Sequence, residues 1–389
     1  MIKPIFIVSY LCLLSFNLTA GEFSGNIGIE GRYFPNAPLY AEQTPQHFSL
    51  SVQPEFRHRW DNGRNKFTFV PFYRWDKHDD ERTHGDIREL DLISAQGNWE
   101  IQLGISKVYW GVTESQHLVD IINQTDAVEG LDGEEKLGQP MLRLSHFLDN
   151  GELAVYLLPY FRERTFVGQA GRLRPPFVVA DDSRYEARNQ EKHLDYALRW
   201  SENIGNIDFA LHWFSGTARN PDFNLIDGKV TPYYSLLRQI GLEFQYTGDA
   251  WLWKLESVYR HKNQTNYTVA VGGFEYTLTG VADSVMDVGL LAEYHRDSRG
   301  KQANVALQKD VFLGARLTFN DVQSTSLLAG MMVDVDSHNR SLRLEASRRL
   351  GESMLLNLEG QWFGQPDADS PLYLLRADDY IQLALQWFF

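Results

Sequence analysis

Apolar and polar residues alternate with a period of two along most of this chain. In 46–60, for example, Phe48, Leu50 and Val52 alternate with serines and a glutamine. A β-strand places alternate residues on opposite faces, whereas a helix would scatter the same residues around its axis. The pattern therefore predicts strands throughout the chain, each with one apolar and one polar face. Eighteen are predicted: 23–33, 46–60, 65–76, 86–96, 98–110, 139–147, 151–162, 193–202, 205–216, 233–247, 250–261, 267–280, 284–296, 308–320, 324–336, 340–350, 352–364 and 377–389.

The connections between these segments differ in length according to strand parity. Every even-numbered segment is followed by a tight turn, such as Asp61-Asn62-Gly63 or Asp149-Asn150-Gly151. Most odd-numbered segments are followed by longer connections: 34–45, 111–138, 163–192, 217–232, 297–307 and 365–376. A transmembrane barrel with short periplasmic turns and long extracellular loops has this asymmetry. The sequence thus predicts an all-β fold, an antiparallel transmembrane β-barrel of about 18 strands (16–18).

Tryptophans divide in the same way. One group lies at the short-turn ends: Trp60, Trp99, Trp200, Trp251 and Trp387. A second group lies toward the long loops: Trp75, Trp110, Trp213 and Trp362. Two aromatic girdles at the two membrane interfaces would produce this division.

Composition and the chain start fit an exported barrel. Aromatic residues make up 13% of the 389 residues, and no stretch beyond the first twenty residues approaches 18 consecutive apolar residues. Residues 1–20 have the positive start, short apolar core and small final residue of a secretory signal peptide. Removing them would leave residues 21–389 as a single barrel domain, without the lone Cys12. The net charge of -14 argues against nucleic acid as a partner.

The last segment carries a resemblance to a known class. One face holds Gln382 and Gln386, and the other holds apolar residues that end on Trp387 and Phe389. This ending resembles the C-terminal segment of Gram-negative outer-membrane barrels, which their assembly machinery recognises. The resemblance implies an outer-membrane location, an assembly signal at Trp387 and Phe389, contact with membrane lipid and lipopolysaccharide, and a homotrimer as one oligomeric form.

A barrel of 16–18 strands encloses an aqueous channel unless something fills it. Charged residues on the polar strand faces are therefore predicted to line the pore. The basic wall residues selected on this argument are Arg57, Arg59, Arg74, Arg199, Arg316 and Arg343.

The connection 111–138 is strongly acidic and also contains apolar residues that are unusual in a solvated loop. Its acids are Glu114, Asp120, Asp126, Glu129, Asp132, Glu134 and Glu135. The third long loop of general porins folds into the lumen, and 111–138 is similar to it in order and charge. The resemblance implies that this loop narrows the pore. An acidic surface loop, or a calcium site formed by Asp126, Glu129, Asp132 and Glu134, are the alternatives.

The function predicted from these features is diffusion of small hydrophilic solutes through a porin. A substrate-specific channel or exporter for saccharides or carboxylates is one alternative, and a non-conducting scaffold around a partner protein is another. The sequence contains no glycine-rich serine elbow and no His pair at helical spacing, so no enzyme activity, metal or cofactor is predicted.

Overall fold

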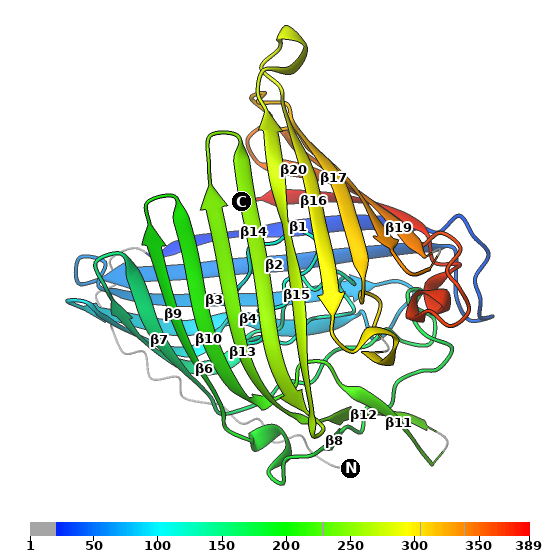
Figure 1. Ribbon diagram of the computed structural model, residues 1–389, viewed down its shortest axis with the longest axis horizontal. Helices are drawn as coiled ribbons and strands as arrows, with labels where there is room; N and C mark the ends of the chain where they lie inside the picture. Colours follow the sequence, from blue (N-terminus) through cyan, green and yellow to red (C-terminus); the bar gives the residue numbers. More distant parts are fainter. Residues whose placement is uncertain (1–20, 228, 304, 338) are drawn as a thin grey trace, which may run out of the picture.

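A computed structural model describes residues 21–389 except 228, 304 and 338, so the predicted signal peptide 1–20 lies outside the described residues. Eighteen antiparallel strands form one closed barrel, because β1 pairs with both β2 and β21 (Figure 1). They are β1 (Glu22–Tyr33), β2 (Gln46–Trp60), β3 (Asn65–Asp76), β4 (His84–Gln96), β5 (Trp99–Ser106), β6 (Gln139–Phe147), β7 (Gly151–Leu158), β9 (Asp195–Ile204), β10 (Ile207–Thr217), β13 (Leu236–Thr247), β14 (Trp251–Lys262), β15 (Thr265–Leu278), β16 (Asp287–Asp297), β17 (Asp310–Thr318), β18 (Ser326–Asp334), β19 (Arg340–Leu350), β20 (Met354–Trp362) and β21 (Tyr380–Phe388).

The eighteen predicted strands are confirmed. Four of them, 46–60, 65–76, 139–147 and 340–350, agree to the residue. The largest difference is at 98–110, because β5 ends at Ser106 and the chain then turns into the barrel.

Because apolar and polar side chains alternate, each strand has an apolar face on the outside of the barrel and a polar face toward the lumen. On β2, Phe48, Leu50 and Val52 are exposed on the outside, whereas His47 and Ser49 are buried inside. The large exposed side chains on the outward faces are mostly apolar, which is the arrangement a hydrocarbon solvent requires.

The tryptophan girdles are only partly as predicted. Trp60, Trp99 and Trp251 are exposed near the short turns. Trp110, however, was predicted for the opposite girdle and is 4% exposed inside the barrel, against Tyr156 and His212. It lies in a loop, since β5 ends before it, and it packs in the interior.

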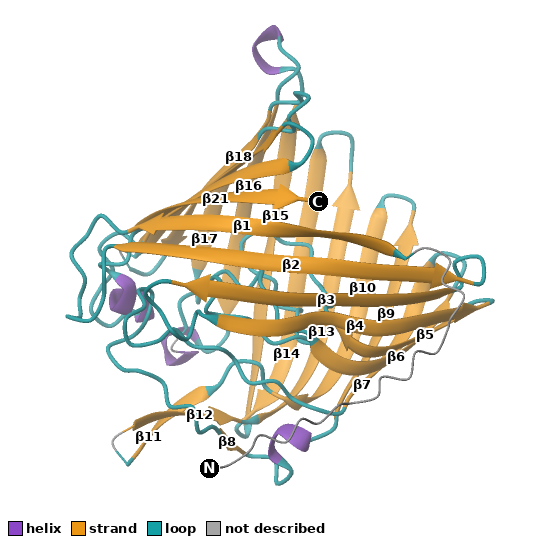
Figure 2. Ribbon diagram, turned by 180° about the vertical axis from the view of Figure 1, so that it is seen from behind, coloured by secondary structure: helices purple, strands orange, loops and turns teal. Residues whose placement is uncertain are grey.

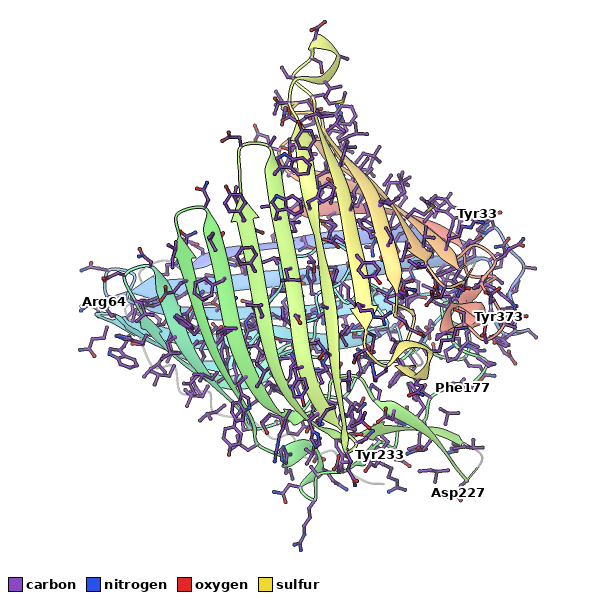
Figure 3. All side chains as sticks on the ribbon, in the orientation of Figure 1. Tyr33, Arg64, Phe177, Asp227, Tyr233 and Tyr373 are labelled. Carbon is purple, nitrogen blue, oxygen red and sulfur yellow. The ribbon has the colours of Figure 1, made fainter. Side chains whose placement is uncertain are left out.

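The two ends of the barrel differ as the connections predicted. Figure 3 shows Arg64 at the short-turn end, and Tyr33, Tyr373 and Tyr233 toward the long-loop end. The turn predicted at 280–282 is longer than expected, spanning 279–286 with a 3-10 helix, η2 (Val281–Asp283). At the long-loop end a small sheet forms from β8 (Arg184–Tyr185), β11 (Asp222–Ile226) and β12 (Lys229–Tyr234).

The remaining regular elements are short 3-10 helices in connections: η1 (Gln190–Lys192), η3 (Gly300–Ala303) and η4 (Pro371–Leu375). Within the described part of the chain, no helix is long and apolar enough to cross a membrane.

Candidate pore constriction

Residues 107–138, between β5 and β6, leave the wall and contact opposite sides of the barrel interior. We call this segment the inner loop. Its apolar residues explain part of this path, because Leu118, Val119 and Ile122 are buried against inward side chains of the wall such as Phe214 and Val258. Figure 2 shows loop segments between the β2–β4 wall and the β13–β14 wall. The apolar stretch that was unusual for a solvated loop therefore forms a core inside the barrel.

Three wall carboxylates bind the backbone of the inner loop on one side. Glu256 of β14 accepts the N–H groups of Val112 (2.7 Å) and Thr113 (3.0 Å). It also accepts the Thr113 hydroxyl (2.7 Å) and the N–H of Val119 (3.2 Å). The Glu256 carboxylate is fully buried, so these donors replace the water that a charged group otherwise requires.

Glu293 of β16 repeats this arrangement one step along the loop. It accepts the N–H groups of Glu114 (2.7 Å) and Ser115 (2.9 Å). Ser115 Oγ also lies 2.7 Å from Nε2 of His295. On β13, Glu243 accepts the N–H of Gly111 at 3.4 Å. Carboxylates of the wall thus accept hydrogen bonds from consecutive backbone N–H groups of the inner loop.

Gly111 is the residue that permits this close approach. Its φ is +123°, and a Cβ here would lie 2.7 Å from Nδ1 of His117 and 2.8 Å from Oε1 of Glu256. A side chain at this position would therefore push the loop away from its anchoring carboxylate.

Arginines of the opposite wall bind the other half of the inner loop. Arg88 lies 2.7 Å from Asp126, and Arg74 lies 2.7 Å from Glu129. His84 lies 3.1 Å from Asp126. Burial alone would raise the pKa of Asp126, but the His84 hydrogen bond and the Arg88 charge prevail and lower it to about 2. Asp126 is therefore a buried anion that docks the loop on β4.

Of the seven predicted loop acids, three face a common cavity. Glu114 pairs with Arg316 at 2.6 Å, Asp132 with Arg343 at 2.5 Å, and Glu134 lies 3.4 Å from His117. All three acids line a cavity of about 730 Å³ between the inner loop and the β17–β21 wall.

The other four predicted acids have different surroundings. Asp126 and Glu129 are held by the arginines of β3 and β4, and Asp120 pairs with Lys136 within the loop. Glu135 is exposed. The four acids of the calcium alternative do not converge, since Asp132 and Glu134 pair with Arg343 and His117 instead.

His84, Asp126 and Glu129 do bring ligand-type atoms within 4.8 Å of one another. The guanidinium groups of Arg74 and Arg88 already bind these two carboxylates. The positive charges of these two arginines disfavour the binding of a metal ion at this place.

The predicted wall arginines are likewise divided. Arg74, Arg316 and Arg343 contact the inner loop, and Arg199 pairs with Glu243 at 2.9 Å. Arg57 pairs with Glu55 of its own strand, and Arg59 is exposed near the short-turn end. These last two line the wall outside the region where the loop docks.

The residue selection from sequence missed Glu256 and Arg88. Glu256 falls on the polar face of an alternating segment, so the pattern could have identified it. Arg88 lies in 86–96, where both faces carry apolar residues and the inward face could not be assigned.

Comparison with known proteins supports the architecture. The chain matches no protein-family model and no curated protein sequence. Its structure is similar to that of Pseudomonas aeruginosa OccD3 (OpdP), with a TM-score of 0.55, 9% identity and coverage of 96% of this chain and 92% of that one. An engineered Rh. blastica porin gives a TM-score of 0.48 at 12% identity, covering 95% and 100% of the two chains. The closed 18-strand barrel and the similarity to OccD3 show an outer-membrane porin-like fold.

Proposed function

We propose that the protein is a channel for small hydrophilic solutes in the outer membrane of a Gram-negative bacterium, narrowed by the inner loop. The cavity between this loop and the β17–β21 wall carries the proposal, because the loop is docked on the other walls. The solute path then runs beside Glu114 and Asp132 on one side and strands β17–β21 on the other.

The lining charges favour cations. Five carboxylates face the cavity, against one guanidinium group and one imidazole: Glu114, Asp132, Glu134, Glu345 and Glu359, with Arg343 and His117. Carboxylate excess at a narrow passage attracts cations and repels anions. The arginines of β3 and β4 do not offset it, since Arg74 and Arg88 are buried in ion pairs. Carboxylate solutes are accordingly disfavoured.

The wall side of the same cavity supports a second candidate, a substrate-specific channel. Phe312, Leu328 and Met332 line it, and the Phe312 ring lies against Gly330, where a Cβ would be 2.3 Å from the ring. An apolar strip opposite carboxylates would suit a solute with an apolar body and a cationic group.

The test is ion conductance of the refolded chain in a planar bilayer under a KCl gradient. We expect open channels whose reversal potential has the sign that indicates a preference for potassium over chloride. The double variant Glu114→Gln with Asp132→Asn leaves Arg316 and Arg343 without these loop partners, so selectivity should shift toward chloride. Glu55→Gln is the matched control, since Glu55 pairs with Arg57 away from the cavity.

The outcomes separate the candidates. Absence of conductance in the unchanged chain would refute a channel and favour the scaffold alternative. Chloride preference, or a double variant that behaves like Glu55→Gln, would refute the assigned path. Saturable block by an arylalkyl ammonium ion, but not by a carboxylate of the same size, would favour the substrate-specific channel.

A further inference from the structure

The outward face of β10, β13 and β14 changes from apolar to polar within one step of the strand register. Two successive rows of cross-strand neighbours show the change. The apolar row consists of Trp213, Ile240 and Tyr259. The rim row lies two residues closer to the long-loop end and consists of Ser215, Arg238 and His261. Since residues two apart share a strand face, both rows point outward.

On other strands the outward residue at this level is apolar on some and polar on others, since Arg296 of β16 and Arg340 of β19 are also exposed there. On β17 and β18 the corresponding outward pair is Val311 and Val333, and on β1 and β21 it is Tyr33 and Ile381. The members of the apolar row are 43%, 56% and 48% exposed in chain order, as expected for residues that face lipid. Arg238 and His261 are exposed directly above them.

The Arg238 guanidinium group is available to a ligand. Among the described residues no carboxylate lies within 4.0 Å of it, whereas Arg299 in a nearby loop pairs with Asp297 at 2.6 Å. Arg238 and His261 also line a hollow of about 580 Å³ at the rim. The one carboxylate in its lining, Glu186, accepts the N–H of Leu236 at 2.7 Å.

Two arginines of a long loop at this end of the barrel are held by contacts within the protein. In the loop between β7 and β9, Arg172 is buried and lies 2.6 Å from Asp378, and Arg174 donates to the carbonyl oxygen of Gln169. Neither group is free to bind a phosphate outside the barrel.

We propose that the rim row binds the phosphate group of an anionic lipid of the outer leaflet, with its acyl chains along the apolar row. A guanidinium fork and a hydroxyl supply donors that match phosphate oxygens. His261, whose Nδ1 lies 2.7 Å from Oδ1 of Asn266, adds a donor at Nε2 when its ring is protonated. The apolar row places the acyl chains directly below, at the depth where aromatic residues mark a membrane interface. This proposal rests on the membrane location given under the proposed function.

The experiment measures lipid retained by the refolded full chain after incubation with diphosphoryl lipid A, using native mass spectrometry. We expect the unchanged chain to retain this lipid and the double variant Arg238→Gln with His261→Gln to retain at least about fivefold less. Arg238→Lys should give an intermediate result, because lysine keeps the charge without the fork. Arg348→Gln is a control for loss of an exposed arginine, since Arg348 lies at the short-turn end and pairs with Asp321 at 3.1 Å.

Two further measurements identify whether the bound phosphate belongs to a lipid. Phosphatidylcholine should be retained less than lipid A, and inorganic phosphate at equal concentration should not displace lipid A. Equal retention by the double variant, retention independent of the lipid phosphate, or displacement by inorganic phosphate would each overturn the proposal.

Conductance provides a separate measurement, because no residue of the rim row lines the cavity. The double variant should conduct like the unchanged chain. Loss of conductance in both would refute the channel, while lipid retention would still decide whether the rim row binds lipid.

Discussion

His117 is the one titratable residue of the inner loop that contacts acids of both the loop and the wall. Its imidazole lies 3.4 Å from Glu134 and 3.7 Å from Glu256. Interaction with the Glu134 carboxylate, and then with Glu256, raises the pKa of His117 to about 10. At neutral pH the side chain is therefore an imidazolium ion that links the loop to β14.

This charge predicts a pH dependence of loop docking. A raised pKa means that the stabilisation is complete below the unfolded value near 6.5 and is lost as pH rises through about 10. We expect open-channel current noise to increase over this interval as the loop loosens. His117→Gln should remove the dependence, and a variant whose noise still follows the same curve would contradict the assignment.

At the residue scale, the sequence could predict which side chains face inward but not which of them meet. Alternation identified Arg74, Arg316 and Arg343 as inward, and the same rule selected Arg57 and Arg59. Only the docked loop distinguishes these two groups, because its contacts join residues up to 211 positions apart, as with Asp132 and Arg343.

At the element scale, the strands were predictable and the inner loop was only partly so. Strand faces follow from a local period of two, and a closed barrel leaves little choice of neighbour. The course of 107–138 depends instead on distant anchors, above all Glu256. The acidic charge of the loop was evident in the sequence, but the capture of its backbone by wall carboxylates was not.

The anchor at Glu256 predicts that Glu256→Gln weakens loop docking. An amide offers one acceptor oxygen in place of two. If that oxygen keeps the bonds from Val112 and Thr113, the N–H₂ group faces the N–H donor of Val119. Losing charge-assisted bonds of this kind costs about 2–3 kcal/mol. We expect faster proteolytic cleavage within 107–138 in detergent. Glu55→Gln serves as control, and equal cleavage rates in the two variants would show that Glu256 does not hold the loop.

At the scale of the whole molecule, Phe389 takes part in closing the barrel. Phe389 exchanges two backbone hydrogen bonds of 3.1 Å with Gly25, extending the β1–β21 pair. Its ring contacts Phe23 at 5.9 Å and Trp387 at 5.7 Å between centroids. The C-terminus thus completes the seam at which the first and last strands meet.

This position predicts that Phe389→Ala lowers the yield of folded barrel in cells, through slower assembly and a weaker seam. Phe147→Ala is the matched control, because Phe147 is similarly exposed at the end of β6 but lies outside the seam. The folded fraction is measured by the shift in gel mobility on heating. Equal folded fractions in the two variants would exclude a special role for Phe389.

The attachment of the inner loop through its peptide groups has an evolutionary consequence. Every residue except proline provides a backbone N–H, so the bonds to Glu256 and Glu293 do not constrain the side chains at 112 or 114. Substitutions there can alter what passes the cavity while the loop keeps its place. The wall residues that hold the loop and the loop residues that line the cavity can therefore change independently during evolution.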